Sequence, residues 1–237
     1  MFRLNRVTML VVLTALLAAT AFAGTINVDG DDSEWGSPLA SVDDPNGDVS
    51  NTYYDIDAIF ADYDATANRL GFMTRTVAPM NHIDGADRVE FIFNADDDTT
   101  TGSPSTHGFV GGDYHIIWDL DGVANVAYDY TSGTNQPQFR TWTTSGWTYQ
   151  KGLAADDLKI AWGDMGTSYS VIECTINPEK LGNPDEFVWG CYLDNGGGSN
   201  DDSAEGRVGG DDDSPEPATW VLLAATAVFG VLKRRRG

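Results

Sequence analysis

The segment Arg88-Val89-Glu90-Phe91-Ile92-Phe93-Asn94 has the pattern of a strand that is buried on one side. Val89, Phe91 and Phe93 alternate with other residues, so an extended chain places their three apolar side chains on one face. Similar runs precede and follow this segment, separated by clusters of Gly, Asn, Asp and Pro that favour turns. We therefore predict an all-β fold, an antiparallel β-sandwich of the jelly-roll or immunoglobulin-like type.

The predicted strands fill one domain, residues 24–198. Besides 88–94 they cover 25–28, 55–61, 69–76, 114–120, 123–130, 138–143, 147–150, 168–176 and 186–193. Asp121-Gly122 stands between two apolar runs and indicates a hairpin turn. Pro178-Glu179-Lys180-Leu181 favours a single helical turn, with Asn177 as its cap.

The composition agrees with a turn-rich β domain and excludes other classes of protein. The 237 residues include 26 glycines, and 36 acidic against 14 basic residues give a formal net charge of −22. Nucleic acid is excluded as a partner because phosphate binding needs a basic surface. The 41% of hydrophobic residues, with 7 Trp, 9 Tyr and 10 Phe, exclude a disordered acidic chain.

Residues 1–23 have the organisation of a secretory signal peptide with an apolar helix. Arg3 and Arg6 precede an apolar run from Val7 to Thr20. Ala21-Phe22-Ala23 then supplies the small residues of a cleavage site, and cleavage is expected before Gly24. A retained membrane anchor is the alternative, but the apolar run is short for one.

The other end of the chain combines three features in a fixed order. Pro215-Glu216-Pro217 is followed by an apolar segment, Ala218 to Leu232, and then by the cluster Lys233, Arg234, Arg235 and Arg236. We predict a short transmembrane helix with its basic end on the cytoplasmic side. The preceding residues 199–214 are rich in Asp, Gly and Ser, which is typical of a flexible linker.

This arrangement resembles the PEP-CTERM sorting signal of bacterial surface proteins, here residues 215–237. The resemblance implies processing near Pro-Glu-Pro by an exosortase, a membrane transpeptidase, with secretion machinery as a further partner. It also implies export to the cell surface or extracellular matrix of an exopolysaccharide-producing Gram-negative bacterium, after a transient inner-membrane stage. An ordinary C-terminal anchor is the alternative.

The domain itself carries a second resemblance. The segment from Ile26 to Trp35 runs from a strand into Asp-Gly, an acidic residue and Trp, and it resembles the opening of DOMON-like β-sandwiches related to family-nine carbohydrate-binding modules. Weaker matches follow in the same order at Asp55-Ile56, 70–72, 89–96, 112–114 and 169–178. The resemblance implies a non-catalytic domain that binds or organises polysaccharide.

Carboxylates gather in two places that suit Ca²⁺, which takes six to eight oxygen ligands. In the loop 96–102, Asp96 and Asp98 stand two residues apart, and Asp113 follows a Gly-Gly pair on the next predicted strand. A solvated acidic turn is the alternative. The domain start offers Asp29 and Asp31, and the family resemblance implies late acidic partners. Asp32 and Glu34 belong to the same opening segment, and the late partners that the resemblance implies are Asp194, Asp201 and Asp202. We expect at least one structural Ca²⁺.

Two tryptophans are candidates for ligand binding. Trp142 and Trp147 flank residues 143–146, a predicted hairpin tip. Indole rings stack on sugar faces because they are rigid and amphipathic. The alternative is burial in the core, which we predict for Trp118 and Trp189 because they lie in apolar strands.

Cys174 and Cys191 are the only cysteines, and both lie in late predicted strands. In an oxidising compartment we expect a disulfide between neighbouring strands. It would close a loop of about 17 residues and contribute roughly 3 kcal/mol. Two buried free thiols are the alternative.

The sequence contains no motif that selects catalytic residues. It has neither a Gly-x-Ser-x-Gly elbow nor a zinc motif. We therefore predict an exported, calcium-stabilised, non-catalytic protein that binds polysaccharide. A purely structural surface protein is the main alternative, and a glycoside-active enzyme with a close carboxylate pair is a weaker one.

Overall fold

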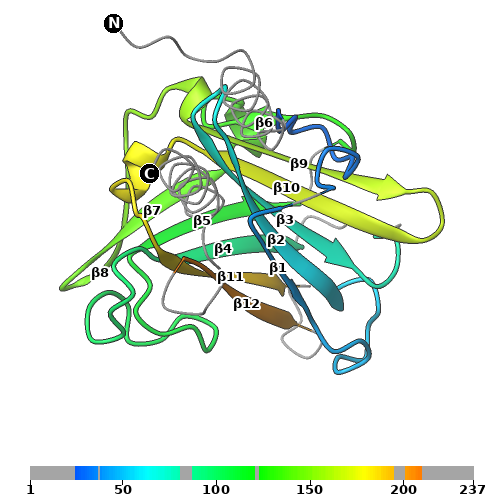
Figure 1. The fold of residues 1–237 in the computed structure, drawn as a ribbon, viewed down its shortest axis with the longest axis horizontal. Helices are drawn as coiled ribbons and strands as arrows, with labels where there is room; N and C mark the ends of the chain where they lie inside the picture. The colour runs from blue at the N-terminus through cyan, green and yellow to red at the C-terminus, as the bar shows by residue number, and fades with distance from the viewer. Residues whose placement is uncertain (1–24, 37, 81–86, 121–122, 195–200, 210–237) are drawn as a thin grey trace, which may run out of the picture. The chain divides into compact units, whose positions relative to one another are not determined.

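Two antiparallel sheets of six strands form a β-sandwich in the computed structural model, which describes residues 25–36, 38–80, 87–120, 123–194 and 201–209 (Figure 1). The first sheet has the order β1 (Ala40–Asp43), β2 (Ile56–Asp64), β3 (Arg69–Thr76), β10 (Tyr169–Ile176), β9 (Leu158–Met165) and β6 (Tyr128–Asp129). The second has the order β12 (Asp202–Val208), β11 (Phe187–Asp194), β4 (Arg88–Asn94), β5 (Tyr114–Asp119), β7 (Gln138–Thr143) and β8 (Gly146–Tyr149). The predicted all-β sandwich is confirmed.

The core lies between the sheets and is rich in aromatic rings. Phe72 on β3 points across from the first sheet to rings of the second, with centroids 4.7 Å from Phe93 and 5.8 Å from Phe187. Val89, Phe91 and Phe93 are all fully buried, as their alternation predicts. Trp118 and Trp189 are also in the core, as predicted. Each such side chain contributes about 1.5–3 kcal/mol by its burial.

The helical content of the described segments consists of short 3₁₀ turns. They are η1 (Gly133–Asn135), η2 (Ala155–Asp157) and η3 (Pro178–Leu181). In η3 the side chain of Asn177 accepts a hydrogen bond from the backbone N–H of Glu179, so the predicted cap is confirmed. No helix among these residues has the length and apolarity needed to cross a membrane.

Several strand predictions are wrong, for identifiable reasons. Residues 25–28 are irregular and not a strand. The short edge strand β1 and the strand β9 were not predicted, because β1 has a half-exposed polar pattern and β9 directly follows two aspartates. Asp121 and Gly122 lie outside the described residues. The strands on either side of them, β5 and β6, belong to different sheets and therefore do not form a hairpin.

The linker predicted at 199–214 is wrong for residues 202–208. They form β12, which pairs along its whole length with β11, and the compact unit extends to Gly210 and not to residue 198. The residues of β12 that face inward are Asp202, Ala204 and Gly206. Their small or polar side chains conceal the alternation that would identify a strand.

The predicted disulfide is also wrong. Cys174 lies on β10 of the first sheet and Cys191 on β11 of the second, and both thiols are free and fully buried. Facing sheets pack about 10 Å apart, whereas a disulfide needs Cα atoms within about 7 Å. Burial raises the pKa of both thiols, that of Cys191 to about 12, so both stay protonated.

The sequence ends lie outside the described residues. This applies to the signal peptide with Ala21, Ala23 and Gly24, and to the sorting signal with Pro215, Glu216, Pro217, Arg234, Arg235 and Arg236. The predicted terminal helices fall in the same segments.

Candidate functional site

An aromatic and polar surface covers the outer side of the hairpin formed by β7 and β8. Phe139 points into the core, so its neighbours in β7 point outward. Trp147 pairs with Trp142, and Tyr149 with Arg140, which places all four on the same side. We call Gln138, Arg140, Trp142, Trp147 and Tyr149 the hairpin surface.

The two tryptophans of the hairpin surface are half-buried. Their rings meet edge to face with centroids 5.4 Å apart. Trp147 also contacts the ring of His115, and its indole N–H donates to Thr106 Oγ1 at 3.3 Å. The hairpin tip predicted at 143–146 is confirmed, since Thr143 pairs with Gly146. The predicted pair therefore lies side by side, partly accessible and partly held by its neighbours.

The rest of the hairpin surface is more open. Tyr149 is 54% exposed, and the Arg140 guanidinium carbon lies 4.5 Å from the centre of its ring. Arg140 also donates to the hydroxyl of Tyr149 at 2.6 Å and to Gln138 Oε1 at 2.8 Å. These contacts hold the guanidinium and the phenol in one position, so a flat apolar face and hydrogen-bonding groups lie together.

A buried acid and two histidines lie beside this surface. Glu90 Oε2 accepts hydrogen bonds from His115 at 2.6 Å and His107 at 3.0 Å. Burial raises the pKa of Glu90, but the two histidine hydrogen bonds outweigh it and hold the pKa at about 2. Burial lowers the pKa of His115. Glu90 is therefore ionised beside a neutral His115 whose Nε2 carries the proton.

This arrangement leaves two neighbouring polar atoms without partners. His115 Nδ1 and Arg140 Nε are buried and have no hydrogen bond among the described residues. His115 and Arg140 are directly paired on β5 and β7. One atom is an acceptor and the other a donor, and a hydroxyl group can serve both. Unpaired buried polar atoms are rare enough to call for an explanation.

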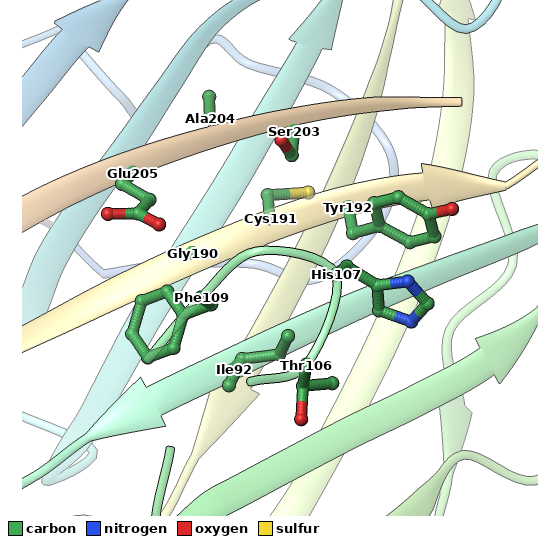
Figure 2. A pocket seen from close by; sticks show the side chains of 10 residues that line it. All are labelled: Ile92, Thr106, His107, Phe109, Gly190, Cys191, Tyr192, Ser203, Ala204 and Glu205. Atoms are coloured by element: carbon green, nitrogen blue, oxygen red, sulfur yellow. The ribbon is translucent and has the colours of Figure 1, made fainter. Parts of the chain in front are cut away.

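A small pocket opens on the same outer side of the second sheet (Figure 2). The loop with Thr106, His107 and Phe109 lies over β11 and β4 and forms one wall. The rings of His107 and Tyr192 stack with centroids 3.7 Å apart. The ring of Phe109 packs directly on Gly190, so that a Cβ added to this glycine would lie 2.8 Å from the ring. The pocket has room only for a water-sized group, and Glu205 is the one carboxylate among its described lining residues.

The acidic loop predicted as a calcium site does not bring ligand atoms of Asp96, Asp98 and Asp113 within 4.8 Å of one another. Asp96 and Asp98 accept hydrogen bonds from residues of their own loop, including Thr101 and Thr100. Asp113 Oδ2 accepts from the backbone N–H of Ala95 at 3.0 Å. Two groups of three acidic residues elsewhere have ligand atoms within 4.8 Å of one another in the described segments, and neither includes these aspartates.

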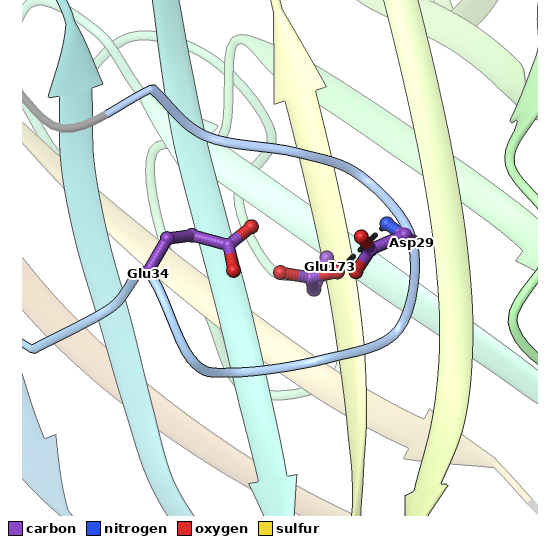
Figure 3. A group of neighbouring side chains, drawn as sticks. All are labelled: Asp29, Glu34 and Glu173. Carbon is purple, nitrogen blue, oxygen red and sulfur yellow. Dashed lines mark hydrogen bonds between the residues drawn. The ribbon is translucent and has the colours of Figure 1, made fainter.

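The first of these groups contains Asp29, as predicted, with Glu34 and Glu173 (Figure 3). Both oxygens of Glu173 are occupied, because Oε2 accepts from the backbone N–H of Asp29 and Gly30 and Oε1 accepts from the indole of Trp35. Burial raises the pKa of Glu173 to about 7. The hydrogen bonds of Glu173 therefore hold the opening loop against β10.

Of the other residues predicted with Asp29, Glu34 belongs to the same group and Asp202 to the second group, whereas Asp31 and Asp201 lie elsewhere. Asp31 accepts a hydrogen bond from the backbone N–H of Ser33, and Asp201 accepts one from the hydroxyl of Tyr192 at 2.6 Å. Neither belongs to a group of three acidic residues in the described part of the chain.

Sequence reasoning missed Asp44 and Asp48, which form the second group together with Asp202. The signal was present, since Asp44-Pro45-Asn46-Gly47-Asp48 places oxygen-bearing side chains at every second position of a tight loop. Alternate positions supply the first three side-chain ligands of an EF-hand loop as well.

Comparisons with known proteins leave the family open. No family matches the chain, and no curated protein matches it. Among solved structures, the chain is similar to a family 9 carbohydrate-binding module from Caldicellulosiruptor kristjanssonii in complex with glucose. The match has a TM-score of 0.36 and 12% identity, and covers 82% of this chain and 96% of that one.

Proposed function

We propose that this protein is an exported, non-catalytic surface protein that binds polysaccharide through the hairpin surface. The observation that carries the proposal is the pair of half-exposed rings of Trp142 and Trp147 on one face of β7–β8, next to the open ring of Tyr149. Flat aromatic faces pack against the C–H groups of sugar rings, and three on one surface suit a chain of sugar units.

The polar groups beside these rings supply the second half of a sugar site. Arg140 is held by Tyr149 and Gln138, and its Nε and the nearby His115 Nδ1 are unpaired. Sugar hydroxyls both donate and accept hydrogen bonds, so a hydroxyl that reaches these two atoms can satisfy them. Such pairing favours binding because unpaired buried groups cost about 1–3 kcal/mol each.

Retention on a panel of soluble and insoluble polysaccharides tests this proposal. We expect the purified protein to be retained on at least one of them, and Trp142→Ala or Tyr149→Ala to weaken that binding about tenfold, equivalent to about 1.4 kcal/mol. Tyr53→Ala is the matched control, because Tyr53 is an exposed tyrosine far from the hairpin in sequence, at 42% exposure. Equal retention of all variants contradicts binding through the hairpin surface, and no retention of the parent protein favours the structural surface protein instead.

Export and sorting are part of the same proposal and are supported by the two ends of the sequence. Cleavage before Gly24 and near Pro215-Glu216-Pro217 leaves the acidic domain outside the inner membrane. Mass spectrometry of the protein from its producing cells should find both ends removed. Replacement of Pro215, Glu216 and Pro217 by alanine should leave the tail attached and the protein in the membrane fraction. An intact tail in the unmodified protein contradicts the sorting part alone.

A further inference from the structure

We propose that Asp44, Asp48, Asp55 and Asp202 form a calcium site that joins the two sheets at one edge of the sandwich. The site is independent of the hairpin surface, and of its four members only Asp202 is among the calcium ligands predicted from the sequence. Its members come from three separate segments, which are the end of β1, the loop into β2 and the start of β12.

Three of the four carboxylates lie directly together. Ligand atoms of Asp44, Asp48 and Asp202 lie within 4.8 Å of one another. Asp55 directly precedes β2, and its charge acts on both Asp44 and Asp202. None of the ion pairs among the described residues includes any of the four, so their combined negative charge has no basic partner there.

Unpaired oxygens distinguish this group from an ordinary acidic turn. Asp55 is fully buried, and its Oδ1 has no hydrogen-bond partner among the described residues. The same is true of the buried Oδ2 of Asp44. A buried carboxylate oxygen needs a hydrogen-bond donor or a cation, because burying it alone costs several kcal/mol. The group at Glu173 differs, since three donors occupy both of its oxygens.

The remaining oxygens are held in place by the backbone. Asp55 Oδ2 accepts from the N–H of Gly47 at 2.8 Å, which curls the loop back over Asp55. Asp202 Oδ2 accepts from the N–H of Ile56 at 2.6 Å, and its Oδ1 accepts from Ser203 at 2.7 Å. Gly47 has φ of +85°, a conformation that glycine adopts without strain. These hydrogen bonds fix the positions of Asp55 and Asp202 within the group.

The chemistry of the donors selects calcium. All four side chains offer carboxylate oxygen, which hard cations prefer, and there is no His or Cys in the group. Ca²⁺ accepts six to eight oxygens in irregular geometry, and loop carbonyls and water can complete the set. Mg²⁺ needs a near-ideal octahedron, which segments of this kind supply less well.

A cation at this position has a structural consequence. β1 is an edge strand of the first sheet and β12 an edge strand of the second. Asp202 already reaches from β12 to the backbone of β2. Calcium bound between Asp202 and the loop that follows β1 therefore ties the last strand of the domain to the opposite sheet.

Calcium titration of the full chain after removal of metal by chelator tests the site. We expect binding by isothermal titration calorimetry, with a rise in Tm of about 5–10 °C at calcium 100 times above Kd. Asp48→Asn should weaken calcium binding at least tenfold and remove the rise in Tm. Asp48 is exposed, so this variant should fold, and circular dichroism without calcium checks that it does.

Asp29→Asn is the matched control, because it changes an exposed carboxylate of the other acidic group. It should bind calcium as tightly as the parent protein. The proposal is overturned if the parent protein does not bind calcium with a Kd below about 1 mM. This value is about the Kd of the weakest extracellular calcium-binding modules. It is also overturned if Asp48→Asn binds as tightly as the parent protein, or if Asp29→Asn alone abolishes binding.

Discussion

The indole N–H of Trp35 donates to Glu173 Oε1 at 2.7 Å, across 138 positions of sequence. Glu173 is on the outer side of β10, where it is fully buried by the loop that carries Trp35. Trp35, Met73 and Val171 form a small apolar cluster around this bond. The opening segment, which resembles family-nine modules in sequence, therefore packs over the outer side of the first sheet. The carboxylate of Glu173 holds it there.

This carboxylate gives the protein a defined pH dependence. The pKa of Glu173 is raised by burial from 4.5 to about 7, so the folded state binds more protons than the unfolded state between these values. The free energy of unfolding should therefore fall as pH rises from 4.5 to about 7, with Glu173 contributing at most about 3 kcal/mol. Urea unfolding across this range measures the slope.

Glu173→Gln should make that slope shallower, because the amide does not titrate. The substitution should also lower the free energy of unfolding by about 1–3 kcal/mol. The NH₂ group of the glutamine would face a donor whose hydrogen bond the carboxylate accepts. Glu179→Gln is the control, since Glu179 is exposed on η3, and it should keep the parent slope. An unchanged slope in Glu173→Gln contradicts the assignment.

The sequence predicts the sandwich well where burial alternates with large side chains. The strands at 69–76, 88–94 and 138–143 agree with the prediction to the residue. The alternation fails at β12, where the inward residues are small, and Gly206 in particular carries no apolar signal. Its role depends on Trp189, which lies directly across from it on β11. That partner is visible only when the chain is folded.

Gly206→Ala tests whether β12 is an integral strand. A Cβ at this position would lie 2.3 Å from the ring of Trp189, which is fully buried and has no room to move. We expect a loss of about 1–3 kcal/mol in the free energy of unfolding, as for other overpacked cores. Gly36→Ala meets nothing within 4 Å and should be neutral. A neutral Gly206→Ala would show that the segment behaves as the linker predicted from its composition.

The two cysteines give a prediction that distinguishes a disulfide from two buried free thiols. Cys174 and Cys191 belong to different sheets and are fully buried as free thiols. Tm should therefore be the same with and without dithiothreitol. A thiol reagent should label two groups per chain in denaturant and none in the native protein. Labelling in denaturant that requires prior reduction contradicts this and restores the disulfide.

The candidate sites could be predicted from the sequence only where their residues are close in the chain. Trp142 and Trp147 are five positions apart, so a hairpin alone brings them together. Asp55 and Asp202 are 147 positions apart, and their proximity depends on the pairing of β12 with β11. The acidic run at 96–98 is the stronger composition signal, but Asp96 and Asp98 accept hydrogen bonds within their own loop and Asp97 pairs with Arg207. Local density of acidic residues therefore does not identify the groups whose ligand atoms lie within 4.8 Å of one another.

Asp44→Asn should have opposite effects on stability without and with calcium. In chelator, the amide removes one of four mutually repelling charges and adds an N–H donor to a group that has unpaired acceptor oxygens. We expect the variant to be about 1 kcal/mol more stable than the parent protein in that condition. In excess calcium it should be the less stable of the two, because it has lost a charged ligand.

Asp98→Asn is the control for this crossover. It alters an exposed carboxylate whose hydrogen bonds stay within its loop, so its small effect should be the same in both conditions. Thermal unfolding of the three proteins in chelator and in calcium gives the comparison directly. If Asp44→Asn loses the same stability in both conditions, Asp44 acts through a fixed hydrogen bond and not through a bound cation.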